Sequence, residues 1–100
     1  MKIEQKEENG YPVIYPEGEI DINFSPKLRE ALMSKVSKKP EKLYIDCTDV
    51  KYIDSSGIAT LVEALREIRK YDGEMIVRNC STEVRSVFEI SKLDKVFSLE

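Results

Sequence analysis

The tetrapeptide Asp54-Ser55-Ser56-Gly57 places a carboxylate next to two adjacent hydroxyl groups in the middle of the chain. An apolar run over residues 43–47 precedes it, and a long apolar periodicity over residues 58–68 follows it. This order predicts a strand, a loop and a helix, with the serines at the start of the helix. Aspartate and serine oxygens accept the unpaired N–H groups of such a helix end. The same end attracts anions, including a phosphate attached to a serine.

A second polar loop is expected beside this one. Glu19 and Asp21 lie within residues 18–24, between a predicted strand and the first predicted helix. Open α/β sheets place their sites outside the carboxyl ends of their strands. We therefore expect residues 18–24 and 50–57 to lie side by side, with the two carboxylates forming an acidic rim around the serine hydroxyls.

The residue inventory disfavours catalysis by these groups. A nucleophilic serine needs a base, but the chain has no histidine and no pattern supports Lys51 in that role. A loop that cradles phosphate normally has several glycines, and Gly57 is the only one nearby. Asp21 and Asp54 could serve as a general acid and base or hold a metal, although such residues more often cap helices or face a partner. We expect a protein that is not an enzyme, and a helix cap remains the simplest interpretation of the serines.

The composition restricts the class of protein further. One hundred residues with 41% hydrophobic side chains predict a single domain, residues 1–100, with an ordinary core. A net charge of -3 provides no basic surface for nucleic acid. No apolar run approaches the roughly 20 residues that cross a bilayer, and residues 1–8 lack the apolar segment of a signal peptide, so we expect a cytoplasmic protein. Cys47 and Cys80 show no CxxC spacing, which favours small thiols in or near the core over a metal or redox site.

Alternating and helical patterns predict the elements that position the tetrapeptide. Strands are predicted at residues 1–7 and 11–15, joined by an Asn9-Gly10 turn, and at residues 43–47 and 74–79. Residues 16–21 are predicted to form a loop. Residues 93–99 form a short closing segment whose type the sequence leaves open.

Three helices are expected between and after these strands. Ser25 is predicted to cap a first helix that ends before Pro40. The second helix carries the apolar stripe over residues 58–68, and Ser81 or Thr82 caps the third. The resulting order, ββαβαβα, predicts an α/β fold with a small, mixed, mostly parallel four-stranded sheet and helices mainly on one face.

The motifs resemble a known family. Residues 54–59, Asp-Ser-Ser-Gly-Ile-Ala, together with residues 43–50 before them, are similar to the core motif of the STAS domain, the sulphate transporter and anti-sigma factor antagonist family. The Gly-Glu-Ile-Asp sequence at residues 18–21 resembles a turn of that family, and residues 72–74 and 80–88 fit its later strand and helix. The resemblance covers essentially the whole chain.

The resemblance implies an anti-sigma factor antagonist of the stand-alone bacterial type, which takes part in partner switching. Such a protein binds an anti-sigma factor with serine kinase activity and thereby releases a sigma factor for transcription. The kinase, which supplies ATP and magnesium, phosphorylates the first serine of the motif, here Ser55, and the modified form is released. A serine phosphatase reverses the modification. We expect the partner-binding residues to be Asp21, Asp54, Ser55, Ser56, Gly57, Thr60 and Glu63, with the last two exposed on the second helix.

An alternative of a different class also follows from the resemblance. STAS-like domains serve as scaffolds, or as modules of transport systems that handle small ligands or lipids. The chain has no additional segment that would build a pocket, which favours the partner switch.

Overall fold

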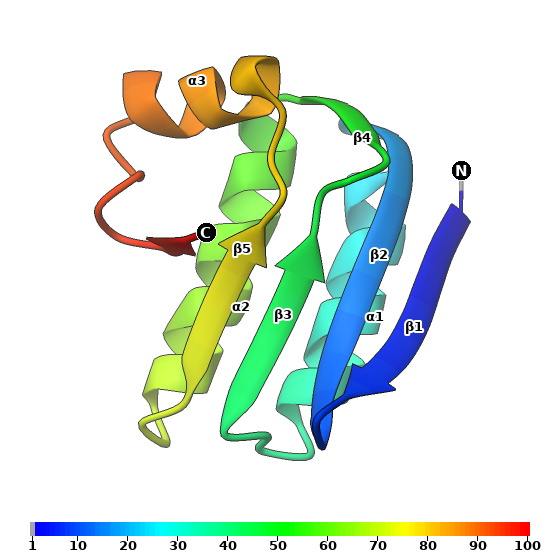
Figure 1. Ribbon diagram of the computed structural model, residues 1–100, viewed down its shortest axis with the longest axis vertical. Helices are drawn as coiled ribbons and strands as arrows, with labels where there is room; N and C mark the ends of the chain where they lie inside the picture. The colour runs from blue at the N-terminus through cyan, green and yellow to red at the C-terminus, as the bar shows by residue number, and fades with distance from the viewer. Residues whose placement is uncertain (1) are drawn as a thin grey trace.

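The computed structural model describes residues 2–100, in which strands and helices alternate after an initial hairpin (Figure 1). Met1, which the sequence placed in the first strand, lies outside the described residues. The strands are β1 Lys2–Glu8, β2 Tyr11–Ile20, β3 Lys42–Asp46, β4 Val50–Ile53, β5 Glu74–Arg78 and β6 Ser98–Leu99. The helices are α1 Ser25–Val36, α2 Ser55–Arg69 and α3 Thr82–Ile90. No helix in the described residues is long and apolar enough to cross a membrane.

The strands form one mixed sheet in the order β1-β2-β3-β5-β6, with β4 paired to β2. Within the part of the chain that the structure describes, only the β1–β2 hairpin is antiparallel, and the other pairs are parallel. This confirms the predicted α/β class and the mostly parallel sheet. The four predicted strands correspond to β1, β2, β3 and β5. Two short strands, β4 and β6, bring the sheet to six strands within the described residues.

The prediction of a loop at residues 16–21 is wrong, because β2 continues to Ile20. Its first half pairs with β3 and its second half with β4, in the register Gly18↔Val50 and Ile20↔Ile53. The register shifts between Gly18 and Glu19, and Gly18 has a φ of 91° that few other residues adopt. Gly18 therefore allows a local irregularity in β2, at the point where the pairing changes from β3 to β4.

Helices α1 and α2 lie side by side across one face of the sheet, and α3 lies beyond the carboxyl ends of its strands (Figure 1). The core lies between the sheet and these helices. Its fully buried side chains come from alternate positions of the strands and from the apolar stripes of the helices, among them Ile14, Leu28, Leu32, Ile45, Leu61, Ile68, Val77 and Phe88.

The start of α1 differs from the prediction that Ser25 caps it. The helix begins at Ser25, whose hydroxyl instead donates to the carbonyl oxygen of Asp21 at 2.7 Å. The Asp21 carboxylate accepts the N–H groups of Asn23 and Phe24, both at 3.0 Å. Asp21 therefore satisfies the backbone of the entering turn, as aspartate does in many turns.

The face of the sheet opposite α1 and α2 carries a polar and aromatic network centred on Arg78. The guanidinium donates to Asp46 at 2.8 Å, to Glu8 at 2.9 Å and to the Tyr15 hydroxyl at 3.0 Å, and it lies 5.0 Å from the ring centre of Tyr44. We call these five residues the Arg78 network. It joins strands β1, β2, β3 and β5 through side chains that satisfy one another.

Candidate functional site

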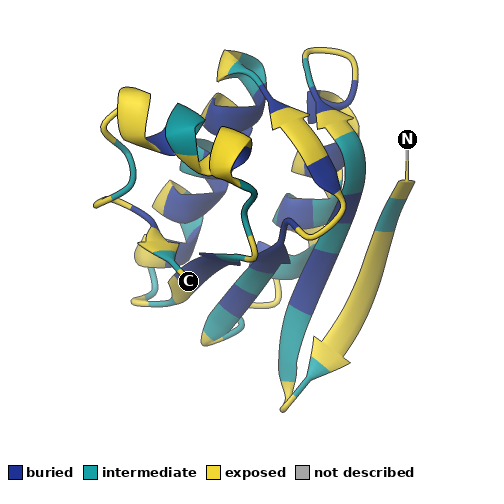
Figure 2. Ribbon diagram, turned by 45° about the horizontal axis from the view of Figure 1, so that its top comes forward, coloured by how far each residue is buried: buried dark blue, intermediate teal, exposed yellow. Residues whose placement is uncertain are grey.

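The Asp54-Ser55-Ser56-Gly57 motif lies where β4 ends and α2 begins, beside the end of β2. Glu19 pairs with Tyr52 and Ile20 with Ile53, and the N–H of Asp54 donates to the Ile20 carbonyl at 3.1 Å. The two loops predicted to be adjacent therefore do lie side by side. Figure 2 views the molecule from this end and shows exposed residues on β4 and on the turn between β2 and α1.

Asp54 caps α2 with its side chain. Its Oδ1 accepts the N–H of Ser56 at 2.9 Å, the N–H of Gly57 at 3.1 Å and the Ser56 hydroxyl at 2.5 Å. The hydrogen bond from the Ser56 hydroxyl, followed by that from the Gly57 N–H, holds the pKa of Asp54 below its usual value. The carboxylate is thus a fixed negative charge at the first turn of the helix.

The two serines differ in their surroundings. The Ser56 hydroxyl is partly buried and also lies 3.2 Å from the Ser25 hydroxyl of α1. Ser55 is exposed, and its hydroxyl has no hydrogen-bond partner among residues 2–100. The structure therefore uses Ser56 to join α2 to α1, whereas Ser55 remains available to another molecule.

Gly57 is buried and permits α2 to approach the sheet closely. A Cβ atom at this position would lie 2.7 Å from side-chain atoms of both Ile20 and Ile53 and 2.9 Å from the Ile20 carbonyl oxygen. Real Cβ atoms almost never approach other atoms so closely. The glycine therefore sets the position of the motif, and it is not an exposed contact residue.

The expectation that Thr60 is exposed on the second helix is wrong. Its side chain is 7% exposed, and its hydroxyl donates to the Ser56 carbonyl at 3.0 Å. Positions 56, 60 and 63 recur at helical spacing, and α1 contacts the residues at both ends of this stripe. Thr60 thus lies on the side of α2 that α1 covers.

Glu63 lies on the same stripe but at its exposed edge. Its carboxylate accepts two hydrogen bonds from Nε of Arg29 in α1, both at 2.9 Å, and one from the terminal guanidinium nitrogen at 2.6 Å. This pairing lowers the pKa of Glu63. In the free protein Glu63 therefore joins the two helices, and about half of its side chain remains accessible.

The two acidic residues at the end of β2 and in the turn that follows it, Glu19 and Asp21, have unequal roles. Glu19 is exposed on β2, whereas Asp21 is half-buried and directs its carboxylate into its own turn. Asp21 reaches the motif through Ser25, which contacts both the Asp21 carbonyl and the Ser56 hydroxyl. Asp21 thus helps to position the site, and only Glu19 presents an exposed carboxylate beside it.

Two exposed apolar residues next to the motif were not identified from the sequence. Ile22 is 71% exposed and Tyr52 is 49% exposed. Ile22 follows the end of β2, where the Ile20 carbonyl accepts the Asp54 N–H at 3.1 Å, so its exposed side chain lies close to the start of α2. We refer to Glu19, Ile22, Tyr52, Asp54 and Ser55 as the Ser55 face. An apolar side chain is normally assigned to the core, and only the fold shows that these two are not there.

The described residues offer no constellation for a metal ion, because no three or more acidic, cysteine or histidine side chains gather in a suitable arrangement. A depression of about 450 Å³ lies at the start of β4 and is lined by Lys2, Glu17, Gly18, Thr48, Asp49 and Lys51. Four of these six residues are charged, whereas small-molecule sites are typically lined by hydrophobic and aromatic side chains.

Comparisons with known proteins identify the family and agree with the fold. The family model for the STAS domain matches residues 2–100. The anti-sigma-B factor antagonist of Listeria monocytogenes is 33% identical over 87 residues, which are 87% of this chain and 76% of the relative. The crystal structure of an anti-sigma factor antagonist from Mycobacterium paratuberculosis has a TM-score of 0.89 at 28% identity and covers 98% of this chain and 83% of its own.

A more distant structure shows the same fold. The Bacillus cell fate determinant SpoIIAA, in its phosphorylated form, has a TM-score of 0.75 at 21% identity and covers 99% of this chain and 91% of its own. The relatives are named as antagonists of other proteins and not as enzymes, in agreement with the role expected from the sequence. The chain belongs to the STAS domain family, and the relatives that it matches over most of its length include anti-sigma factor antagonists.

Proposed function

We propose that this protein binds an anti-sigma factor with serine kinase activity, thereby releases a sigma factor, and is switched off when Ser55 is phosphorylated. A serine phosphatase returns it to the binding form. Because the kinase draws on ATP, the proposed cycle takes place in the cytoplasm. The observation that carries the proposal is the contrast between the two serines, in which Ser56 is bound internally and Ser55 is exposed with no partner among the described residues.

The free protein is well suited to accept a phosphate at Ser55. A phosphoserine adds roughly -1.5 to -2 charge and three acceptor oxygens. At the first turn of α2 the helix dipole attracts this charge by about 0.3–1 kcal/mol. The Ser55 hydroxyl makes no hydrogen bond within residues 2–100 that the fold would lose. Phosphorylation is therefore expected to leave the fold intact.

The same charge opposes a complex that covers the Ser55 face. The ionised Asp54 carboxylate is already present there, and Glu19 lies nearby on β2. A partner that buries this surface must desolvate the phosphate beside like charges, and an unpaired buried ion costs several kcal/mol. Since each ~1.4 kcal/mol changes affinity tenfold, one phosphoryl group is sufficient to weaken binding by about a hundredfold or more.

Ile22 and Tyr52 supply the apolar part of the proposed contact. Any enzyme that transfers a phosphoryl group to the Ser55 hydroxyl must cover the surface around it, and the exposed side chains of Ile22 and Tyr52 belong to that surface. Large side chains that become buried at the centre of an interface contribute much of its binding energy. The docking surface thus combines two apolar residues with a carboxylate rim, which suits a partner with basic and apolar residues on its own surface.

The relatives support the proposal through what their names state. Anti-sigma-B factor antagonists match most of this chain, and SpoIIAA has been studied in a phosphorylated form. The alternative of a ligand-handling module finds no specific support, because the depression at the start of β4 is open and four of the six residues that line it are charged.

A phosphorylation and binding experiment tests the proposal. The protein is incubated with ATP, magnesium and the anti-sigma factor kinase encoded in the same genome, and the modified residue is located by peptide mass spectrometry. We expect one phosphoryl group on Ser55 and none on the Ser55→Ala variant. We expect Ser55→Ala to bind the kinase tightly in the presence of ATP and Ser55→Asp to bind it weakly.

Ser34→Asp provides the matched control, since Ser34 is an exposed serine on α1 away from the motif. It introduces the same charge and should bind like the unmodified protein. Equal, tight binding by Ser55→Asp and Ser55→Ala, or phosphate on a residue other than Ser55, would overturn the proposal.

A further inference from the structure

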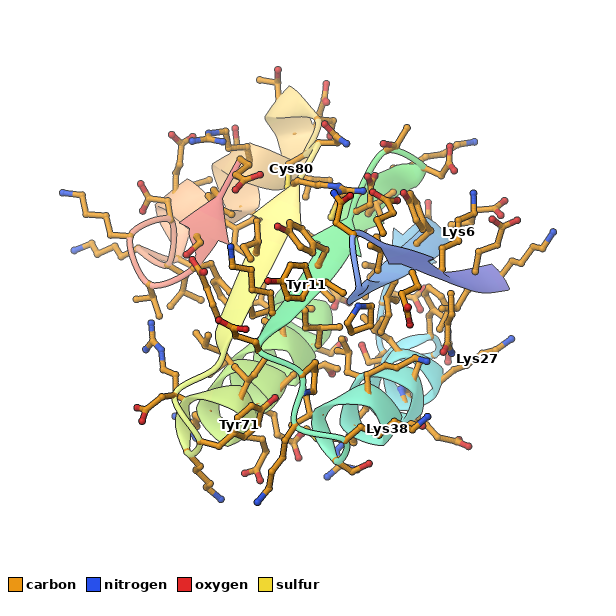
Figure 3. The ribbon with its side chains drawn as sticks, turned by 60° about the horizontal axis from the view of Figure 1, so that its bottom comes forward. Lys6, Tyr11, Lys27, Lys38, Tyr71 and Cys80 are labelled. Carbon is orange, nitrogen blue, oxygen red and sulfur yellow. The ribbon has the colours of Figure 1, made fainter. Side chains whose placement is uncertain are left out.

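The two cysteines of the chain lie together at the carboxyl ends of neighbouring strands. Strands β3 and β5 are paired as far as Asp46↔Arg78, and the N–H of Cys47 donates to the Arg78 carbonyl at 2.9 Å. Cys80 follows two residues later, where β5 leads into α3, as Figure 3 shows. Both cysteines pack against the same hydrophobic core and both are free thiols. The expectation of small thiols in or near the core is confirmed.

The surroundings of the two thiols are unequal. Cys47 is 2% exposed, whereas Cys80 is only partly buried. A hydrogen bond between the thiols, together with burial, raises the pKa of Cys47 well above its ordinary value. The same hydrogen bond, assisted by the charge of Arg85, lowers the pKa of Cys80. Cys47 is thus the thiol that keeps its proton, and Cys80 is the thiol that loses its proton more readily.

This arrangement has the features of an oxidation site with a resolving partner. The thiolate is the reactive form of cysteine, and a positive charge and a helix N-terminus favour it. Cys80 precedes Ser81, whose hydroxyl accepts the Val84 N–H at 3.1 Å and caps α3. Cysteines that respond to oxidants are accessible, have an increased thiolate fraction and often have a second cysteine beside them.

We propose that Cys80 and Cys47 form a peroxide-sensitive thiol pair, in which Cys80 reacts first and Cys47 closes an intramolecular disulfide. The Cys80 thiolate attacks one oxygen of hydrogen peroxide, so that an S–O bond forms, the O–O bond breaks, and the hydroxide released takes up a proton to leave as water. The Cys47 thiol then loses its proton and attacks the Cys80 sulfur, the S–S bond forms, and the S–O bond breaks with release of a second water. Two thiols and one peroxide thus give one disulfide and two waters.

The disulfide would connect two segments that meet near the Ser55 face. Cys47 begins the segment that leads through β4 to Asp54, and Cys80 begins the segment that leads into α3, which packs against β4. A cross-link between residues 47 and 80 constrains the unfolded chain, so the oxidised protein should unfold at a higher temperature than the reduced protein. The inference does not depend on the identity of the binding partner.

The test uses the whole protein and hydrogen peroxide as the probe. The reduced protein is treated with a small molar excess of peroxide, unfolded, labelled with N-ethylmaleimide and examined by intact-mass and peptide mass spectrometry. We expect the loss of two hydrogen atoms, no maleimide label, a cross-linked peptide pair containing Cys47 and Cys80, and full reversal by dithiothreitol. The unfolding temperature should rise on oxidation and return on reduction.

Two variants separate the roles of the cysteines. In Cys80→Ser the reaction with peroxide should be abolished, and in Cys47→Ala a sulfenic acid should persist on Cys80 and be trapped by dimedone. The proposal is overturned by two freely labelled thiols after peroxide treatment, by a sulfinic acid on Cys80 with Cys47 still free, or by a disulfide between two molecules. If Cys47→Ala does not fold, the peptide mapping of the unsubstituted protein decides the matter alone.

Discussion

The Ser55 face and the Arg78 network are both polar clusters on the same sheet, but they differ in how completely their groups are paired. In the Arg78 network, Asp46 is 3% exposed and accepts hydrogen bonds from Thr48, Arg78 and Asn79. On the Ser55 face, Asp54 is equally well paired, but the hydroxyl of Ser55 is exposed and has no partner among residues 2–100. A cluster whose polar groups are all hydrogen-bonded to one another stabilises the fold. An exposed hydroxyl without a partner, such as that of Ser55, is available to bind or react with another molecule.

The largest effect on stability is expected from breaking the Arg78 network. Asp46→Ala removes the acceptor of the Thr48, Arg78 and Asn79 groups and leaves a half-buried guanidinium with Glu8 as its remaining ion pair. We expect a loss of about 3 kcal/mol in the free energy of unfolding, since removing one partner of a buried charge pair costs about 3–5 kcal/mol. Urea denaturation measures it. Kinase binding by the folded fraction should be unchanged, and a loss of affinity there would show that the network belongs to the binding site.

Gly57→Ala tests the close approach of α2 to the sheet. The added methyl group would lie 2.7 Å from side-chain atoms of Ile20 and Ile53. Overpacking of this kind costs about 1–3 kcal/mol, so we expect the free energy of unfolding to fall by about 2 kcal/mol. Gly10→Ala is a comparison that strains the backbone without crowding, because Gly10 has a φ of 85° and no atom within 4 Å of its Cβ position. If Gly57→Ala proves as stable as the unsubstituted protein, the close packing at this position is not required.

Ile22→Asp tests whether the apolar part of the Ser55 face contributes to kinase binding. The substitution replaces an exposed apolar side chain with a third carboxylate near Asp54 and Glu19. We expect kinase affinity to fall about tenfold, which corresponds to ~1.4 kcal/mol, with little change in stability. Ile90→Asp is the matched control, because Ile90 is 81% exposed on α3. Equal affinities of the two variants, measured by calorimetry, would remove Ile22 from the docking surface.

The smallest effect concerns the pH dependence of the Asp54 cap. Hydrogen bonds, first that of the Ser56 hydroxyl, lower the pKa of Asp54 in the folded state. The carboxylate therefore contributes stability above its unfolded pKa of about 3.9, and this contribution is lost as the pH falls through the lower folded pKa. The stability difference between the unsubstituted protein and Asp54→Ser should be constant near neutral pH and shrink below about pH 4. Urea denaturation at several pH values checks this, and a difference that grows on acidification would contradict it.

Much of the site could be predicted because its signals are local. The sequence order around Asp54 predicts a strand, a loop and a helix that starts at the serines, and α2 does begin at Ser55. The simplest interpretation of the serines as the helix cap is wrong, because the Asp54 side chain accepts the N–H groups of the first turn. The adjacency of residues 18–24 and 50–57 follows from the general placement of loops at the carboxyl ends of parallel strands. Both depend on short-range chemistry or on a topological rule.

The features that the sequence analysis missed depend on packing between distant segments. Strand β4 has four residues and exists because it pairs with the second half of β2. Thr60 is buried because α1 covers that side of α2, and no local pattern shows which side is covered. Ser25 has the residue type of a helix cap, but the carboxylate of Asp21 accepts the backbone N–H groups before α1, and the Ser25 hydroxyl donates to the Asp21 carbonyl instead.

The most direct measurement compares the kinase affinity and the fold of the protein before and after stoichiometric phosphorylation of Ser55. Calorimetric titration should show binding at least about a hundredfold weaker after modification, a difference of about 2.7 kcal/mol. Amide exchange across the strands and helices should remain unchanged apart from the first turn of α2. Undiminished affinity of the phosphorylated protein, or unfolding caused by the phosphate, would contradict a switch that works by charge on an exposed serine.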